Sequence, residues 1–143
     1  MENNKKLTNR RQEREEAFTL VFERMFKDDD SEEVFDSAVE ARDASIGEFT
    51  KLLTNGVYDN LEAIDELIEK NLKGWSKSRI SRVVLTLMRI AAFEIMFVED
   101  VPTSVSINES VELCKKYATE KDASFLNGVL GGVARSAKNN GEK

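Results

Sequence analysis

Histidine is absent from this chain of 143 residues, and cysteine and proline each occur once. Without histidine there is no Ser-His or Cys-His catalytic pair, no histidine-bearing zinc site and no side chain with an unperturbed pKa near neutral pH. A single cysteine excludes a disulfide framework within the chain and is typical of a reducing compartment. The sequence therefore predicts a protein that is not an enzyme, holds no cofactor or metal, and acts on no small-molecule substrate.

Long apolar runs are missing as well. No stretch approaches the ~18 apolar residues of a membrane span, and the first thirty residues are charged rather than signal-like. With 41% hydrophobic and 34% charged residues, the chain is long enough to bury a core as one domain. We therefore expect a soluble, cytoplasmic protein with no membrane partner.

Basic side chains are concentrated at the amino end. Residues 1–14 hold five basic and two acidic groups, whereas residues 15–50 hold three basic and twelve acidic groups. The whole chain has a net charge of −6, so a basic end on an acidic protein points to an anionic partner, most often nucleic acid. A solvated, disordered end without a partner explains the same charges equally well, and composition leaves this choice open.

Apolar residues recur at helical spacing along most of the chain, and no alternating strand pattern stands out. We expect an all-α, compact single-domain bundle of six to seven helices over residues 10–137, with a basic, flexible arm over 1–9 and a frayed tail over 138–143. The expected helices span 10–26, a segment after Ser31 that carries Val34 to Val39, 46–72 (one kinked helix or two), 79–98, 102–117, and a last helix that ends near Ala137.

Polar residues at the expected helix starts suggest the N-caps, and Trp75 has an ordinary structural interpretation. Ser76 or Ser78 is expected to cap helix 79–98, and Asp122 or Ser124 the last helix. Trp75 is interpreted as filling a seam between helices.

Two further features could be mistaken for chemical sites: a pair of glutamates on one helix and the single cysteine. Glu109 and Glu112 share a helix face, but no histidine completes a di-iron set, so they are interpreted as solvated or ion-paired. Cys114 is interpreted as a small buried hydrophobe.

Arg10, Arg11 and Arg14 are expected to form one exposed cluster on the first helix. A basic first turn opposes the helix dipole, and an external anion would relieve this conflict. Phe125 follows a lysine-bearing loop, and a ring beside basic groups suits single-stranded RNA, whose bases stack on aromatic side chains. A core position on the last helix explains Phe125 equally well.

Four segments, taken in order, resemble one known family. Residues 10–22 read RRQEREEAFTLVF, residues 87–95 read LMRIAAFEI, residues 100–113 read DVPTSVSINESVEL, and residues 125–130 read FLNGVL. Together they resemble the NusB family of transcription antitermination factors over roughly residues 10 to 135.

The resemblance implies an all-helical domain that binds the boxA element of nascent ribosomal RNA, as a single strand, together with the ribosomal protein NusE. It implies indirect links to other elongation-complex factors and to RNA polymerase, and suppression of premature termination. The expected RNA-binding residues are Lys5, Lys6, Arg10, Arg11, Arg14, Phe22, Lys121 and Phe125. The expected partner-binding residues are Val84, Glu120, Asp122 and Asn127.

Some positions depart from the family pattern, and other functions stay open. Gln12 interrupts the arginine run, Glu13 adds an opposing charge, and Val84 stands where many relatives carry an acid. In the loop from Glu120 to Ser124, residues 121–123 read KDA in place of the commoner acid-Ser pattern. These departures leave contact details and affinity open. The alternatives are a non-catalytic helical interaction module that homodimerises and an accessory subunit of an rRNA-modifying enzyme. The sequence does not decide between monomer and homodimer.

Overall fold

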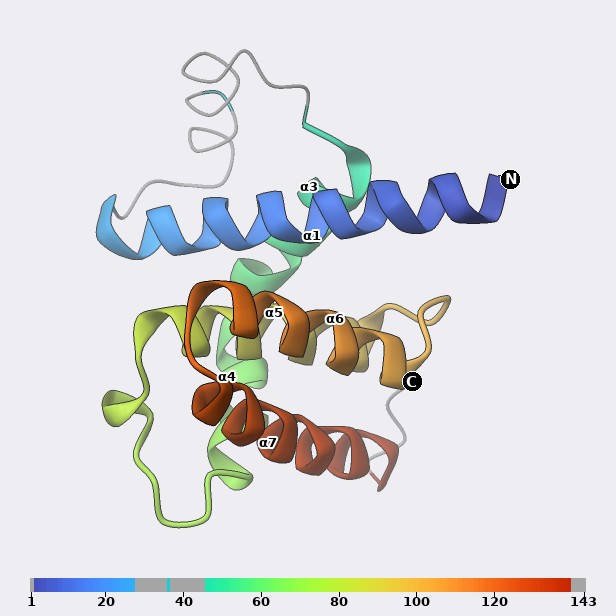
Figure 1. Ribbon diagram of the computed structural model, residues 1–143. Coiled ribbons are helices and arrows are strands. Elements are labelled where there is room, and N and C mark those ends of the chain that lie inside the picture. Colours follow the sequence, from blue (N-terminus) through green and yellow to red (C-terminus); the bar gives the residue numbers. More distant parts are fainter. Residues whose placement is uncertain (1, 28–35, 37–45, 140–143) are drawn as a thin grey trace. The chain divides into compact units, whose positions relative to one another are not determined.

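The computed structural model describes residues 2–27, 36 and 46–139, and the side chains of 10–25, 36 and 46–138. Every regular element in these residues is a helix, as the sequence predicts (Figure 1). The chain divides into two compact units, residues 1–59 and 60–143. The first holds α1 (Glu2–Lys27) and α3 (Glu48–Asp59); the second holds α4 (Leu61–Lys70), the short 3₁₀ helix η1 (Lys77–Arg79), α5 (Arg82–Phe97), α6 (Thr103–Tyr117) and α7 (Glu120–Asn139).

Several element boundaries differ from the expected ones. Helix α1 begins at Glu2, so residues 2–9 are helical rather than an arm outside the helix. The stretch 46–72 forms two helices, and Asn60 separates them without a side-chain capping bond. The helix expected after Ser31 lies outside the described residues. Helix α7 continues to Asn139, two residues beyond the expected end of the domain.

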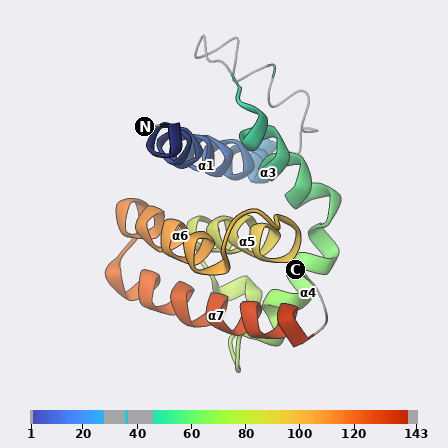
Figure 2. The same cartoon turned by 90° about the vertical axis from the view of Figure 1, so that its right-hand side faces the viewer.

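In the first unit, α1 and α3 lie side by side (Figure 2). The Thr50 hydroxyl donates to the Glu13 carbonyl oxygen (3.0 Å), and the Tyr58 hydroxyl donates to the Val21 carbonyl oxygen (3.2 Å). Residue numbers rise from Glu13 to Val21 on α1 as they rise from Thr50 to Tyr58 on α3, so the two helices run in the same direction.

Glu13 ties the start of α3 to α1. Its Oε1 accepts a hydrogen bond from the Phe49 backbone N–H (3.1 Å). A carboxylate at a helix amino end satisfies a free donor and interacts favourably with the helix dipole. A Cβ at Gly47 would meet the Glu13 carboxylate, so a larger residue there would displace this side chain and its hydrogen bond to Phe49. Glu13, which adds an opposing charge to the arginine run, therefore has a structural role.

Helix α5 is the centre of the second unit and contacts α4, α6 and α7 (Figure 2). Its side chains are buried on most sides, as predicted by the apolar residues of segment 79–98, which cover more than one face of a helix. Even Glu94, near its carboxyl end, is only 1% exposed and accepts a hydrogen bond from the Ser106 hydroxyl (3.1 Å).

Helical spacing predicts that Ile107, Val111, Cys114 and Ala118 form the buried face of α6, but of these four only Cys114 is buried. Ser106 and Ser110 are buried with it, at intervals of four residues, whereas Ile107 and Val111 are half-buried. Small side chains allow close helix approach, and the Ser110 hydroxyl donates to the Leu87 carbonyl oxygen of α5 (3.4 Å). Buried hydroxyls need such partners because an unpaired one costs free energy.

The helix caps fall on other residues than those expected. Ser81 caps α5, since its Oγ accepts from the Val84 N–H (3.2 Å). The Thr119 hydroxyl accepts from the Asp122 N–H (3.0 Å), and the Asp122 carboxylate accepts from the Thr119 N–H (3.3 Å). This reciprocal pair is a capping box at the start of α7. Asp122 thus takes part in the cap from inside the helix.

A charged cluster joins three elements of the second unit. Asp65 of α4 accepts two hydrogen bonds from the Arg89 guanidinium of α5 (2.9 and 2.8 Å) and one from Lys77 of η1 (3.1 Å). Lys77 also lies 3.5 Å from Glu69. The Asp65 and Arg89 side chains are 12% and 13% exposed, so these charges are largely removed from water. Bidentate pairing of this kind fixes geometry as well as charge.

Asp65→Asn should lower the free energy of unfolding by about 2–4 kcal/mol, because it leaves the largely buried Arg89 charge without its anion and removes one of the two carboxylates beside Lys77. The matched control is the neighbouring Glu66→Gln, which breaks a pair with Lys70 whose side chains are 60% and 68% exposed. This control should change stability by less than about 0.5 kcal/mol. Urea denaturation followed by circular dichroism measures both, and equal effects of the two variants would contradict the role assigned to Asp65.

Candidate nucleic-acid interface

The arginines of α1 do not form the exposed cluster that the sequence suggested. Arg11 is exposed and Arg10 is half-buried, but Arg14 is only 4% exposed. The Arg10 and Arg14 guanidinium carbons lie 4.5 and 5.2 Å from the centre of the Phe49 ring. Both cations therefore interact with the face of a ring that α3 supplies. The expectation of three exposed arginines is wrong for Arg14.

The other expected RNA-binding residues of the first unit are Phe22, Lys5 and Lys6. Phe22 is half-buried, and its ring stacks on that of Phe18 at 5.8 Å and 30°. Lys5 and Lys6 belong to α1, but their side chains lie outside the described residues. In the first unit, Arg11 is thus the expected residue whose described side chain is most clearly presented to solvent.

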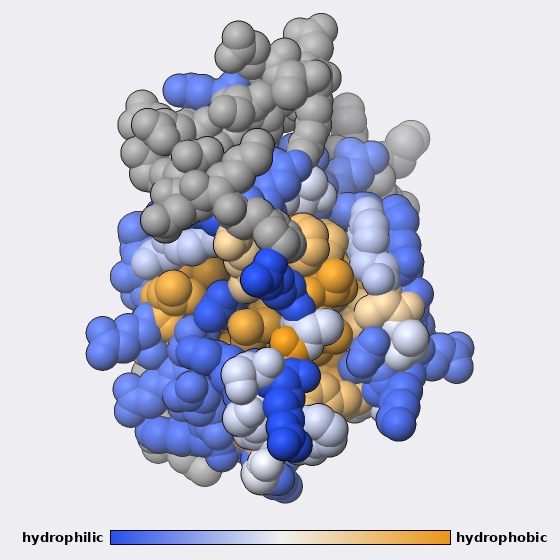
Figure 3. Space-filling model, turned by 90° about the vertical axis from the view of Figure 1, so that its left-hand side faces the viewer, coloured by the Kyte–Doolittle hydropathy of each residue, from blue (hydrophilic) through white to orange (hydrophobic). Residues whose placement is uncertain are grey.

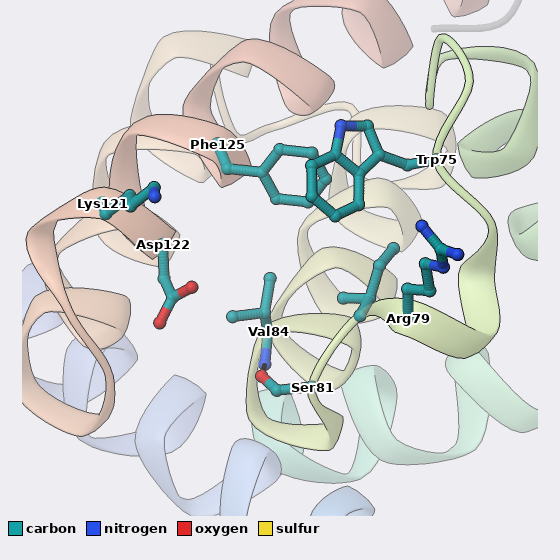
Figure 4. A pocket seen from close by; sticks show the side chains of 8 residues that line it. Trp75, Arg79, Ser81, Val84, Lys121, Asp122 and Phe125 are labelled. Carbon is teal, nitrogen blue, oxygen red and sulfur yellow. Dashed lines mark hydrogen bonds between the residues drawn. The ribbon is translucent and has the colours of Figure 1, made fainter.

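The second unit contains a pocket of about 190 Å³ that is formed by the η1 loop and the first turns of α5 and α7 (Figure 4). Ser81 and the capping box at Thr119 set where these two helices begin, and so place the pocket walls. The face of the molecule that carries the η1 loop exposes apolar surface between hydrophilic side chains (Figure 3). The lining residues are Trp75, Arg79, Ile80, Ser81, Val84, Lys121, Asp122 and Phe125.

Two aromatic rings form one side of this pocket. Trp75 and Phe125 lie 5.5 Å apart between ring centres, with their planes at 55°. Phe125 is half-buried, so its ring is neither fully exposed for base stacking nor fully buried in the core. Trp75 is 55% exposed, and the interpretation that it fills a seam between helices is wrong. It follows Lys73 and Gly74, whose φ angles of +46° and +92° form the tight turn that presents it.

The pocket brings together residues expected to have different partners. Lys121 and Phe125, expected to bind RNA, line it beside Val84 and Asp122, expected to bind a protein partner. Val84 is only 2% exposed, so a ligand can reach it only through the pocket. The other two expected partner-binding residues, Glu120 and Asn127, are exposed on α7 and do not line the pocket.

Sequence reasoning missed Trp75 and Arg79 as site residues. Both lie in the irregular segment between α4 and α5, where no helical period indicates which way a side chain points. The sequence signal that could have pointed to this site is a tryptophan directly after a glycine, in a segment that also contains Arg79. Arg79 and Lys121 are both exposed, and they give the rim of the pocket two cations.

Cys114 is buried, with an exposed fraction of 0%, which confirms its interpretation as a core residue. Burial raises the pKa of its thiol, and the nearby Asp122 carboxylate raises it further. A thiol with a raised pKa is a poor nucleophile at neutral pH. Within the described residues no group of three or more acidic, cysteine or histidine side chains could hold a metal ion. The described helices include none long and apolar enough to cross a membrane.

Comparison with known protein sequences gives consistent matches. The model of the NusB family matches residues 11–135. The chain is 38% identical to the transcription antitermination protein NusB of Clostridium novyi (strain NT) over 132 residues, which cover 90% of this chain and 99% of that protein. It is 41% identical to the protein of the same name from Clostridium perfringens (strain SM101 / Type A), over 91% of this chain and 99% of the relative.

Solved structures show the same similarity. NusB from T. maritima has a TM-score of 0.77 at 32% identity, covering 88% of this chain and 90% of that one. A crystal structure of the antitermination factors NusB and NusE in complex with dsRNA contains a chain with a TM-score of 0.79 at 27% identity, covering 89% of this chain and 96% of that one.

Arg14→Ala should lower the free energy of unfolding by about 1–2 kcal/mol, because it removes both the cation over Phe49 and the buried aliphatic stem. Arg11→Ala is the matched control and should stay within about 0.5 kcal/mol of the unaltered protein, since Arg11 is exposed. Urea titration at neutral pH measures both. Equal destabilisation by the two substitutions would show that Arg14 has no special structural role.

The raised pKa of Cys114 makes stability depend on alkaline pH. The folded state favours the protonated thiol, so this contribution is complete below the pKa of the unfolded chain and is lost as pH rises through the folded pKa. The unaltered protein should therefore lose stability more steeply above about pH 8.5 than Cys114→Ala does. Unfolding free energies measured from pH 7 to 10 check this, and parallel curves for the two proteins would contradict it.

Proposed function

The chain belongs to the NusB family, and on that premise we propose that it is an antitermination factor that binds boxA RNA. It binds this element of nascent ribosomal RNA, as a single strand, together with NusE, and suppresses premature termination. Relatives named transcription antitermination protein NusB and a solved complex of NusB and NusE with dsRNA support the antitermination role and the binding of RNA together with NusE. Contacts with RNA polymerase and other elongation factors are made through that complex.

The pairing of exposed cations with accessible rings is the observation that carries this proposal. In the second unit, Arg79 and Lys121 accompany Trp75 and Phe125 around one pocket. Single-stranded RNA offers unstacked bases to aromatic rings and phosphates to basic side chains. Arg11 supplies a further exposed cation on α1. RNA binding by electrostatic capture and base stacking uses each of these groups.

We further propose that the protein acts without catalysis and in the cytoplasm, where nascent transcripts are made. The chain has no histidine for general acid–base work, and its one thiol is buried with a raised pKa. Recruitment of RNA and of NusE requires no covalent step. Affinity then comes from charge and surface, with NusE enlarging the interface.

Fluorescence anisotropy with a labelled boxA-like RNA and a scrambled RNA tests the proposal, with and without NusE. We expect preferential binding that tightens with NusE and has a log–log salt slope of about −3, the value for four or five neutralised phosphates on a single strand. Arg11→Ala should weaken binding and make the slope shallower by about 0.7, because one phosphate contact is lost. The control is Arg135→Ala, which removes the same charge from an exposed position on α7 outside the candidate residues.

Equal or absent binding to both RNAs, even with NusE present, would overturn the proposal. Equal changes of the salt slope in Arg135→Ala and Arg11→Ala would also overturn it, since the charge effect would then be non-specific. A concentration-dependent homodimer with no RNA preference would favour the interaction module instead.

A further inference from the structure

We propose that the pocket between η1 and α7 accepts one unstacked base of the bound RNA strand, with Trp75 as the principal stacking surface. This inference rests on the proposed RNA-binding function and adds a specific subsite to it. Trp75 was not among the residues expected to bind anything, and its role follows from the position of its ring. The pocket belongs entirely to the second unit.

The size of the pocket suits a single base. Its volume of about 190 Å³ is on the scale of one planar ring system and too small for a stretch of strand. Trp75 and Phe125 lie side by side with tilted planes rather than parallel (Figure 4). A base therefore lies against the pocket-facing surfaces of the rings and does not insert between them.

The charges around the pocket suit a nucleotide better than an uncharged apolar side chain. Arg79 and Lys121 lie on opposite sides of the pocket (Figure 4). A strand that crosses the pocket can place the phosphate before the base near one cation and the phosphate after it near the other. Both side chains are exposed, so each can reach toward a phosphate without leaving a buried site.

Two polar side chains in the pocket lining suit the edge of a base. Asp122 is the only carboxylate among the lining residues, and one of its oxygens already accepts from the Thr119 N–H. Its charge disfavours a phosphate inside the pocket and favours the N–H donors of a base edge. The Ser81 Oγ accepts from the Val84 N–H, and its own hydroxyl proton can be donated to a base carbonyl or ring nitrogen.

The single tryptophan of the chain makes the test specific to this pocket. Protein labelled with 5-fluorotryptophan gives one ¹⁹F resonance, from residue 75, whichever unlabelled molecule is added. We expect this resonance to shift when boxA-like RNA binds and to stay in place when NusE binds without RNA. Anisotropy measured on the same samples reports RNA binding independently of Trp75.

Substitutions and abasic RNAs then identify the stacked base. Trp75→Ala should weaken RNA binding about tenfold, the scale of one lost base–aromatic stack, and Trp75→Phe should restore most of the affinity. The control Phe97→Ala removes an aromatic side chain that is 44% exposed at the opposite end of α5, and it should leave affinity unchanged. An abasic substitution at one RNA position should weaken binding to the unaltered protein but not to Trp75→Ala.

Each result decides the inference. RNA that binds tightly while the resonance and the Trp75→Ala affinity stay unchanged would overturn the pocket assignment and leave the proposed function intact. A resonance that moves with NusE but not with RNA would assign the pocket to the protein partner and overturn the inference. RNA that fails to bind the unaltered protein under any condition, NusE included, would overturn both.

Discussion

The bidentate pair between Asp65 and Arg89 is the interaction on which the candidate interface of the second unit depends. It joins α4 to α5, and through Lys77 it also holds the η1 loop. A largely buried ion pair adds little stability compared with apolar residues of the same shape, but losing one partner is costly. Its main contribution here is geometric: Trp75 and Arg79 flank Lys77 in sequence, so anchoring Lys77 restricts where the ring and the guanidinium can lie.

The opposite wall of the pocket depends on a shorter-range constraint. The capping box of Thr119 and Asp122 sets the start of α7, and Phe125 follows Asp122 by about one helical turn. Asp122 thus serves in the cap while its side chain also lines the pocket. A substitution there would change helix stability and the electrostatics of the pocket together, which makes Trp75 the clearer probe of ligand binding.

The sequence predicted the parts of the fold that depend on local periodicity. The wide apolar pattern of α5 and the burial of Cys114 follow from the helical repeat, which neighbouring residues determine. The predicted caps were wrong because Ser76, Ser78 and Ser81 are equally good capping residues and tertiary structure selects among them. The segment around Trp75 has no helical period, so the sequence does not show that its ring is exposed. The prediction that the ring fills a seam between helices was therefore wrong.

The arginines of α1 show why a count of basic residues overstates a nucleic-acid site. Whether Arg14 is exposed depends on Phe49, which lies 35 residues further along the chain and reaches Arg14 only when α3 packs against α1. Because a guanidinium keeps its charge when stacked, Arg10 and Arg14 still contribute positive potential to an anion within the Debye length of about 8 Å. Direct phosphate contact also requires accessibility, which Arg11 has and Arg14 lacks. One segment therefore combines two uses of arginine: holding two helices together and presenting charge to a ligand.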